Sequence, residues 1–289
     1  MISGGNASSL PLVGGLPEPT IKELSKPGRR AFNYPKLDID EEVIEHECLK
    51  TEKAPLPEVS EHDLVMHFSR LAHRNFAVDL GFYPLGSCTM KYNPRFADWV
   101  ASLDGFSNLH PAAPQKQTQG ALEILNVLED YLIKITGMDY ASFQPPAGAS
   151  GELTGLLIIK KYLIENNMDN KINIIVPDSA HGTNPASAKM AGFEVIEVAT
   201  NEEGLVDVKE LKKLVNKDTA GLMLTNPNTG GLFEEDIIEI ADIIHNVDGL
   251  LYYDGANLNA IVGICRPGDM GFDIVHSNLH KTFATPHGG

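Results

Sequence analysis

The stretch LLYYDGANLNAIVGICRPGDMGFDIVHSNLHK, residues 250–281, contains two apolar runs that each lead into polar residues. The first run, Leu250–Tyr253, is followed by Asp254, and the second, Asp273–Ser277, is followed shortly by Lys281. A short apolar run bounded by turn residues is typical of a buried strand in a parallel sheet. In such sheets ligands bind beyond the carboxyl ends of the strands. The stretch therefore predicts two strands, with an acid and an amine placed where a ligand would lie.

The same pattern extends upstream, where short apolar runs alternate with helical stretches. Alternation of strand and helix predicts an α/β fold with a mostly parallel sheet flanked by helices on both faces. An amphipathic helix is predicted before it, at Gln119–Ile135. The further predicted strands are Tyr140–Phe143, Ile172–Val176, Glu194–Val198 and Gly221–Thr225, and the predicted helices lie near Ser150–Glu165, Asn184–Ala191, Asp207–Val215, Glu235–Asn246 and Ala256–Ile261.

The first 60 residues differ from the rest, because six prolines between residues 17 and 57 break any periodic pattern. We expect residues 1–60 to form an N-terminal arm, either disordered or laid against another subunit, with one possible helix at Asp40–Leu49. The large domain is expected to cover residues 61–289 and to open with a helix from Glu61 to about Ala77. The segment Asp79–Pro94 lacks periodicity, and a loop of this length inside a domain is usually functional or disordered.

Composition argues against several classes of protein. The chain has a net charge of -16, whereas a nucleic-acid-binding surface needs clustered Lys and Arg. No run of about 18 apolar residues is present to span a membrane, and the N-terminus lacks the pattern of a secretory signal. The cysteines, Cys48, Cys88 and Cys265, are far apart and odd in number, which favours a reducing compartment and neither a disulfide framework nor a metal site. We therefore expect a cytoplasmic protein without a metal.

A phosphate-binding turn is one possible interpretation of QPPAGASGE, residues 144–152. This small-residue turn follows a predicted strand and opens a predicted helix. Free N–H groups at a helix start, together with the helix dipole, form an anion site. Gly148 and Gly151 would let a phosphate approach closely. An ordinary turn remains the alternative, since many such turns contain Gly and Ala.

Two further polar groups follow predicted strands. His181, in DSAHGTNP after Val176, could stack on an aromatic ligand or shuttle a proton. The alternative for His181 is a structural role near a helix N-cap. Asn226 and Thr229, in NPNTGG, could contact the same ligand, although this composition also favours a simple turn.

Asp254 and Lys281 complete the set. A carboxylate or an ammonium at the end of a buried strand is costly unless it is paired. Burial lowers a lysine pKa, and a neutral amine is a nucleophile able to form a Schiff base. The alternatives are a helix-capping Asp and a surface Lys. Taken together, a phosphate cradle, a stacking His, an Asn, an Asp and a Lys at one sheet edge are the groups that pyridoxal 5'-phosphate requires.

The sequence also resembles a known family. Asp254, followed 27 residues later by Lys281, is similar to the pattern of fold-type I pyridoxal-phosphate enzymes, and NPNTG resembles a turn of aminotransferases. A closer resemblance is to glycine decarboxylase, the P-protein of the glycine cleavage system, and to subunit 2 of its two-subunit form. The blocks that carry it are GSCTMKYNP (86–94), QPPAGASGE (144–152), DSAHGTNPASA (178–188), TNPNTGGLFE (225–234), YYDGAN (252–257) and SNLHKTFATPHGG (277–289).

This resemblance implies roles for individual residues. Lys281 would attach the aldehyde of the cofactor, Asp254 would pair with the pyridinium nitrogen, His181 would stack over the ring and Ala256 would pack under it. His181, Asp254 and Lys281 would be the catalytic residues. The other implied contacts are phosphate N–H groups from Ala149, Ser150 and Gly151 with Ser277 or Thr282 as further donors, Asn226 and Thr229 near the ring oxygen or substrate, and Ser87, Cys88 and Thr89 of the GSCTMK loop where glycine and a lipoyl arm arrive.

The resemblance further implies decarboxylation of glycine, with transfer of the aminomethyl group to the lipoyl arm of the carrier H-protein. It implies a hetero-oligomer of two copies each of subunits 1 and 2. It also implies a C-terminal small domain beyond Gly289, absent from this chain. The rival interpretations are another fold-type I enzyme, such as an aminotransferase or an amino-acid decarboxylase, and a non-catalytic subunit that stabilises an active partner.

Overall fold

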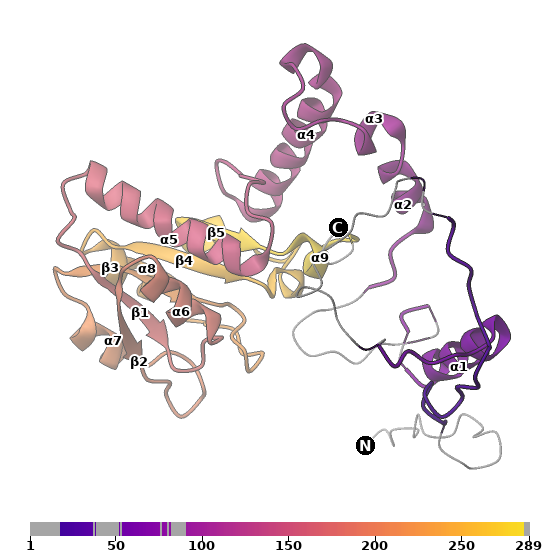
Figure 1. Ribbon diagram of the computed structural model, residues 1–289. Helices are drawn as coiled ribbons and strands as arrows, with labels where there is room; N and C mark the ends of the chain where they lie inside the picture. Colours follow the sequence, from indigo (N-terminus) through magenta and orange to yellow (C-terminus); the bar gives the residue numbers. More distant parts are fainter. Residues whose placement is uncertain are drawn as a thin grey trace. The chain divides into compact units, whose positions relative to one another are not determined.

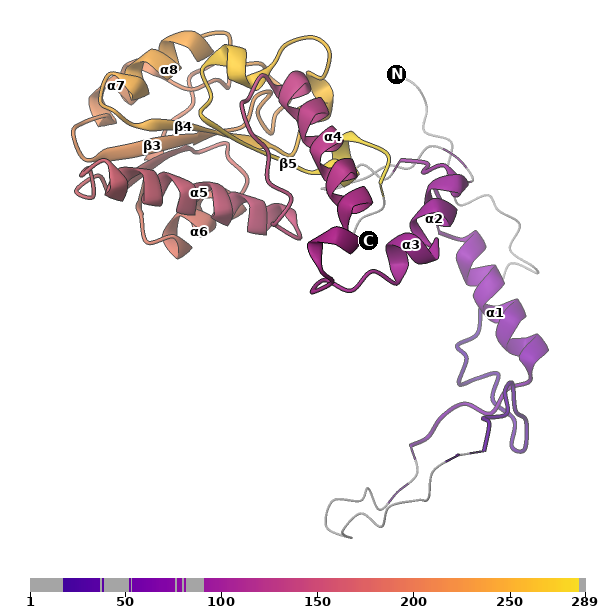
Figure 2. The same cartoon turned by 90° about the horizontal axis from the view of Figure 1, so that it is seen from above.

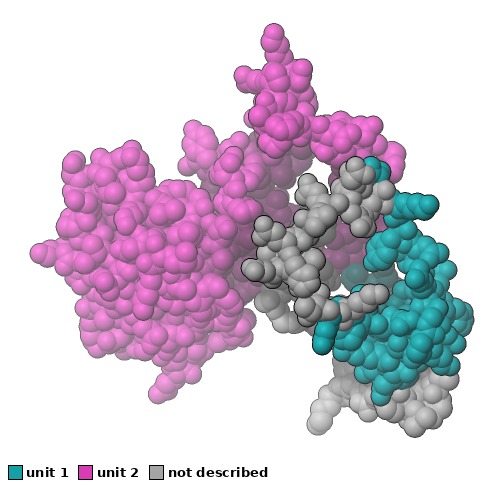
Figure 3. Space-filling model, in the orientation of Figure 1, with its two compact units in different colours: residues 1–84 teal, residues 85–289 magenta. Residues whose placement is uncertain are grey.

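The computed structural model describes residues 18–36, 38, 52, 54–75, 77–79, 81 and 91–285 (Figure 1). The helix expected at Asp40–Leu49 lies outside the described residues. The chain divides into two compact units, Met1–Pro84 and Leu85–Gly289 (Figure 3). The first contains a single described helix, and the second contains the sheet.

The described part of the second unit contains a five-stranded sheet in the order β2-β1-β3-β4-β5. Every neighbouring pair is parallel, as expected from the alternation of strand and helix. The predicted strand positions are confirmed to within a few residues at each end. The strands are β1 (Asn173–Pro177), β2 (Glu194–Val198), β3 (Thr219–Leu224), β4 (Leu250–Gly255) and β5 (Ile274–Ser277).

The strand predicted at Tyr140–Phe143 is wrong. This segment is irregular, and Tyr140 is 87% exposed. The backbone N–H of Ala141 donates to the Glu129 carboxylate at 3.1 Å, so a helix side chain takes the place that a neighbouring strand would occupy. Apolar residues followed by a Pro-rich turn indicated a strand, but the sheet has no partner for it here.

Helices cover both faces of the sheet, as Figure 2 shows. One face is covered by α5 (Gly148–Glu165) and α6 (Thr183–Met190), and the other by α7 (Val208–Leu214) and α8 (Ile237–His245). All four helices were predicted within three residues at each end. The helix predicted at Ala256–Ile261 is instead a series of turns around η5 (Leu258–Ala260), a short 3-10 helix.

Each strand divides its side chains between two cores, because neighbouring residues point to opposite faces. Tyr252 packs with the α5 and α6 side chains, whereas Tyr253 packs with those of α7 and α8. Both tyrosines are fully buried. Burial of an apolar side chain of this size stabilises the fold by about 2 kcal/mol. The residues at the carboxyl end of β4 are therefore held from both faces.

Two glycines allow α5 to approach the sheet closely. A Cβ at Gly155 would lie 2.4 Å from Cε2 of Tyr252, and one at Gly148 would lie 2.7 Å from Nδ2 of Asn278. Real Cβ atoms do not approach other atoms so closely, so a side chain at either position would push the helix away. The glycines bring the N-terminus of α5 beside the segment that follows β5.

The remaining helices of the second unit lie before α5 or after β4. Helix α4 was predicted at Gln119–Ile135, and it ends at Gly137, whose φ of 75° suits glycine. None of the described helices is long and apolar enough to cross a lipid bilayer. The other elements are α2 (Arg95–Ala101), α3 (Asp104–Ser107), η4 (Gln115–Gln117), α4 (Gln119–Thr136), η6 (Pro267–Met270) and α9 (Leu279–Thr282).

In the first unit, α1 (Glu61–His73) starts where predicted and ends earlier than Ala77. Ser60 caps it by accepting from the N–H of Asp63. Part of the expected arm packs on this helix. The Glu18 side chain is 7% exposed and lies 3.5 Å from Nδ1 of His67, with Arg70 and Arg74 also within ion-pair distance. The contact of the arm with α1 was not expected from the sequence.

Candidate functional site

The candidate site lies at the carboxyl edge of the sheet. The strand order reverses between β1 and β3, and such a point is where open α/β sheets bind ligands. His181 follows β1 and Asn226 follows β3, whereas Asp254 is the penultimate residue of β4 and Lys281 lies in α9 after β5. The structure confirms that these residues lie at or after the carboxyl ends of strands in one parallel sheet.

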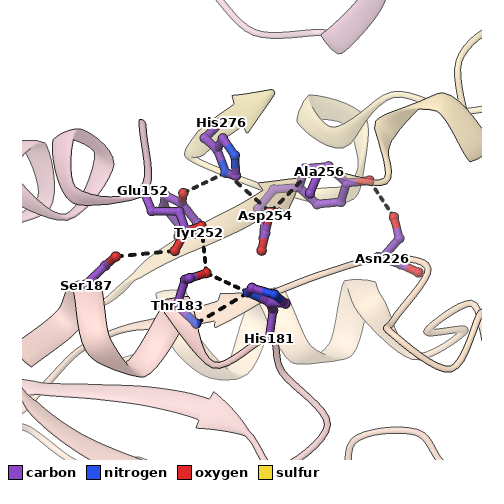
Figure 4. A network of polar contacts seen from close by, with 10 residues as sticks. Glu152, His181, Thr183, Ser187, Asn226, Tyr252, Asp254, Ala256 and His276 are labelled. Carbon is purple, nitrogen blue, oxygen red and sulfur yellow. Dashed lines mark hydrogen bonds and ion pairs between the residues drawn. The ribbon is translucent and has the colours of Figure 1, made fainter. Parts of the chain in front are cut away.

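Asp254 is buried, with 3% of its surface exposed. It belongs to β4, so it is not a helix N-cap. Its Oδ1 accepts the backbone N–H of Ala256 at 3.1 Å and lies 3.3 Å from Nδ1 of His276. The other carboxylate oxygen points toward His181 in Figure 4. One oxygen is therefore held by the protein, and the second faces the space above His181.

His276 and Tyr252 were not predicted as site residues. His276 pairs in register with Asp254 across β4 and β5, and its Nδ1 lies 3.0 Å from the hydroxyl oxygen of Tyr252. Burial, and then the charges of Asp254 and Glu152, raise the pKa of Tyr252 well above its ordinary value. The Tyr252 hydroxyl therefore stays protonated. A polar residue inside an apolar strand, as in DIVHS, was the one signal that could have indicated His276.

His181 is exposed and lies directly before α6. Its Nδ1 is 2.7 Å from the hydroxyl oxygen of Thr183, and that hydroxyl donates to Glu152 at 2.9 Å. Ser187 donates to the other oxygen of Glu152 at 3.3 Å. The backbone N–H of Thr183 also donates to Nδ1 of His181, at 3.4 Å, so Thr183 contacts the imidazole through both its hydroxyl and its backbone. This chain fixes the orientation of the imidazole (Figure 4).

Glu152, which the sequence did not single out, is a buried carboxyl group with 5% exposure. Burial raises its pKa, and the nearby charge of Asp254 raises it further, while hydrogen bonds from Thr183 and Ser187 act in the opposite direction. The carboxyl groups of Glu152 and Asp254 thus both lie at the candidate site. Glycines spaced along the start of α5 were the available signal that this helix face is buried.

The start of α5 has the expected free donors, with one correction. The N-cap, Ala147, makes no side-chain capping bond. The N–H of Gly151 already donates to the carbonyl of Ala147 at 2.9 Å, so Gly151 does not offer its N–H to a ligand. The first-turn N–H groups that precede it, those of Gly148, Ala149 and Ser150, have no acceptor within the helix. Gly151 instead leaves room for His276, whose Cδ2 would lie 3.3 Å from an added Cβ.

Lys281 lies in α9, and its carbonyl oxygen accepts a hydrogen bond from Nζ of Lys91 at 2.6 Å. The same Nζ donates to the carbonyl of His280 at 2.9 Å. Burial lowers the pKa of Lys91. The end of the GSCTMK segment therefore reaches the backbone of the candidate cofactor lysine. Ser87, Cys88 and Thr89 lie outside the described residues.

Asn226 and Thr229 make structural contacts in this loop. Asn226 is fully buried, and its side-chain oxygen accepts the N–H of Glu234 at 3.0 Å. The hydroxyl of Thr229 donates to the carbonyl of Ser179. A contact between these two side chains and a ligand stays a prediction. Ser277, as expected, ends β5 opposite Gly255.

Several buried polar atoms after the strands have no hydrogen-bond partner among the described residues. They include Oγ1 of Thr225 after β3 and Oγ1 of Thr282 beside Lys281. Buried polar atoms are normally satisfied, so unsatisfied ones near a strand edge indicate a ligand or water that completes them. The donor set of hydroxyl and N–H groups fits a phosphate. Within the described part of the chain, no cluster of three His, Cys, Asp or Glu residues has metal-ligand geometry.

Comparisons with known proteins agree with this geometry. The family model Aminotransferase class-V matches residues 150–288. A solved glycine decarboxylase (P-protein) of the glycine cleavage system, in inhibitor-bound form, superposes with a TM-score of 0.62 at 21% identity, over 80% of this chain and 51% of that one. A glutamate decarboxylase domain from Vibrio parahaemolyticus gives a TM-score of 0.57 at 15% identity, over 81% of this chain and 56% of that one. These structures establish the fold.

Curated relatives are much more similar in sequence. A protein of Caldanaerobacter subterraneus subsp. tengcongensis, named probable glycine dehydrogenase (decarboxylating) subunit 2, is 59% identical over 93% of this chain and 56% of its own length. A protein of the same name from Bacillus cereus is 58% identical over the same shares. The chain spans about half the length of the curated relatives it matches. Over nearly its whole length, the chain is therefore similar in sequence to proteins named probable glycine dehydrogenase (decarboxylating) subunit 2.

Proposed function

We propose that the chain carries the pyridoxal-phosphate site of a glycine dehydrogenase (decarboxylating), in which glycine loses CO2. The carrying observation is the buried carboxylate of Asp254, with one oxygen held by Ala256 and His276 and the other facing His181. A buried carboxylate with one oxygen left for a cationic partner suits a protonated pyridine nitrogen. The identity of 59% to a relative of that name supports the choice of glycine.

The residues at this edge fit the cofactor from three sides. The N–H groups of Ala149 and Ser150, with the Thr282 and Ser277 hydroxyls, would bind the phosphate. Asp254 would hold the ring nitrogen, while His181 and Ala256 would lie against the ring. Lys281 would attach the aldehyde. The unsatisfied Thr282 oxygen next to Lys281 supports this arrangement.

When bound, pyridoxal phosphate supplies an electron sink for cleavage of the bond to the carboxyl group of an amino acid. The protein's own contribution is electrostatic and geometric. Asp254 would hold a positive charge at the ring nitrogen, because its carboxylate is buried and is screened little by water. His181, oriented through Thr183, is placed to hold or move a proton above the ring. Lys281 would supply the amine that holds the aldehyde of the cofactor.

The proposal includes two partners. The relatives are named subunit 2, so we propose a second subunit, in a complex of two copies of each, together with an H-protein whose lipoyl arm accepts the aminomethyl group. Half-exposed apolar residues on α4, among them Ile124 and Tyr131 at 50% and 57%, support an interface. If α4 binds the second subunit, Ile124→Glu reduces its co-purification, whereas Met190→Glu on α6 does not. Equal recovery with both variants would contradict this interface.

A cytoplasmic location stays a prediction.

A second candidate is another enzyme of the same fold, such as an aminotransferase. The match of residues 150–288 to the Aminotransferase class-V model favours it. The two functions differ in what happens to the carboxyl group of the substrate. Exchange of labelled bicarbonate into glycine requires reversible decarboxylation, and amino transfer to a keto acid does not. Exchange without amino transfer supports the glycine assignment, and the opposite result rejects it.

Lys281 provides the most direct test of the cofactor site. We expect Lys281→Ala to abolish the visible absorbance that bound pyridoxal phosphate gives when attached to an amine, and to abolish bicarbonate exchange. Lys189→Ala, which changes an exposed lysine on α6, is the matched control and should retain both. Retention of the absorbance band in Lys281→Ala would refute the role of Lys281.

A further inference from the structure

We infer that His276 is a positioning residue for Asp254: its Nδ1–H fixes one carboxylate oxygen so that the other can hold the ring nitrogen of the cofactor. This inference rests on the proposed function, because it assumes that the cofactor ring lies at Asp254. His276 has no role in the reaction as described above, although it is 7% exposed and lies beside the most deeply buried carboxylate of the site.

Register places the two side chains together. His276 of β5 pairs with Asp254 of β4 in a parallel ladder, so both side chains lie on the same face of the sheet. Their Nδ1 and Oδ1 atoms are 3.3 Å apart. The α5 helix covers this face, and it contributes Glu152 as the other carboxyl group near His276. Tyr252, on the same strand as Asp254, completes the surroundings.

The hydrogen on His276 can be assigned from its neighbours. Nδ1 has two of them, Oδ1 of Asp254 and the hydroxyl oxygen of Tyr252 at 3.0 Å. An ionised carboxylate only accepts, so contact with Asp254 requires a hydrogen on Nδ1. Nε2 is buried without a partner among the described residues, and a second N–H there would be a buried, unsatisfied donor. A hydrogen on Nδ1, lying between Oδ1 of Asp254 and the hydroxyl oxygen of Tyr252, is the form in which His276 can donate to Asp254.

His276 itself is not available to a ligand. Its ring stacks on that of Tyr252, with centroids 6.3 Å apart and an interplanar angle of 23°. On the α5 side, an added Cβ at Gly151 would meet His276 Cδ2 at 3.3 Å, so helix backbone lies close against it. His276 therefore acts through Asp254. Without it, Oδ1 keeps only the N–H of Ala256, and the carboxylate can turn away from the ring nitrogen.

The test compares two ligands in cofactor-free protein. One is pyridoxal phosphate, and the other is its analogue in which the ring nitrogen is replaced by CH. The ratio of their affinities measures the interaction of Asp254 with the nitrogen, since both carry the same phosphate and aldehyde. We expect His276→Leu to reduce this ratio about tenfold or more, the size of a lost hydrogen bond to a charged group. Affinity for the nitrogen-free analogue should change little.

Two further variants separate positioning from mere packing. In His276→Asn the amide nitrogen occupies the place of Nδ1, because both atoms are bonded to Cγ, so the wild-type ratio should be retained. In His276→Gln the amide nitrogen is one atom further out, and the ratio should fall as in His276→Leu. His245→Leu is the matched control, because His245 makes a His–Asp pair with Asp273 at 2.9 Å at the amino end of the strands.

Each outcome has one meaning. A wild-type protein that binds both ligands equally would overturn the proposed function, since Asp254 would then not hold the nitrogen. A wild-type protein that discriminates, together with an unchanged ratio in His276→Leu, would overturn the inference alone. If circular dichroism shows that His276→Leu does not fold, the comparison of His276→Asn with His276→Gln decides, and equal ratios in those two overturn the inference.

Discussion

Glu152 shows how a single buried side chain links the fold to the site. Its carboxyl group accepts from Thr183 and Ser187, and the Thr183 hydroxyl in turn contacts His181. Burial raises the pKa of Glu152, with the charge of Asp254 acting in the same direction. The folded protein therefore favours protonated Glu152, and the stability that this provides is lost as pH rises from the unfolded pKa through the folded one.

We predict that Glu152→Gln removes this pH dependence of the free energy of unfolding. Glutamine keeps the size and stays neutral, so it removes the cost of ionising a buried carboxyl group. Between pH 5 and pH 8, the free energy of unfolding of the wild type should fall relative to that of the variant, because the raised pKa of Glu152 makes ionisation costlier in the folded state than in the unfolded state. Urea unfolding at both pH values measures it.

Glu165→Gln on the same helix is the control for this experiment. Glu165 forms an exposed pair with Lys161, with 62% of its side chain accessible. Its substitution should shift stability by the same small amount at both pH values. A constant difference between the wild type and Glu152→Gln across this range would contradict a raised pKa for Glu152.

At the residue scale, the sequence predicted groups that follow strands and missed those that lie within elements. Asp254 and His181 stand out because a polar residue after an apolar run is visible in one dimension. Glu152 looks like any polar helix residue, and its burial depends on how closely α5 approaches β4. His276 becomes meaningful only when the register of β5 against β4 is known, and register is a property of two strands.

At the element scale, the approach of α5 to the sheet depends on its glycines. A Cβ at Gly155 would lie 2.4 Å from Cε2 of Tyr252 and 3.2 Å from Cγ2 of Ile274. Both neighbours are packed side chains, so the helix itself would have to move. Movement of α5 would also displace its N-terminus and Glu152 from the site.

We predict that Gly155→Ala lowers the free energy of unfolding by about 1–3 kcal/mol, as overpacking usually does. The gain in helix propensity, about 1 kcal/mol, acts against this and is smaller than the strain. Gly120→Ala is the matched control in α4, where no atom lies within 4 Å of the added Cβ, and it should be neutral or stabilising. Denaturant unfolding of both variants gives the comparison, and a Gly155→Ala variant as stable as Gly120→Ala would reject the close contact.

The pattern of elements was predictable for physical reasons, and so were its failures. Buried parallel strands such as β3 are continuous apolar runs, which are easy to recognise. Tyr140–Phe143 has the same local composition, but a strand also needs a neighbour, and local composition does not supply one. Ala256–Ile261 has helix-forming residues, yet Asp254 holds the N–H of Ala256 in a turn. In both segments, contacts with other parts of the fold determine the local structure, and local composition does not.

At the scale of the whole molecule, the chain consists of two compact units. In the first unit, Glu18 joins the residues 18–36 segment to α1, because its carboxylate lies near His67, Arg70 and Arg74. The carboxylate is almost fully covered, whereas Arg70 and Arg74 are 43% and 38% exposed. Solvent therefore screens part of the attraction, and the contact is worth about 1–2 kcal/mol.

We predict that Glu18→Gln loosens this segment without affecting the second unit. Trypsin should cleave after Arg29 or Arg30 roughly tenfold faster, because about 1.4 kcal/mol corresponds to a tenfold change in the population of the open form. Cofactor absorbance should be unchanged, because Glu18 and the candidate site belong to different compact units. Glu23→Gln is the control, because Glu23 contacts only Thr20 of the same turn among the described hydrogen bonds. Unchanged cleavage would show that Glu18 does not anchor the segment, and a lost absorbance band would show that the two units are coupled.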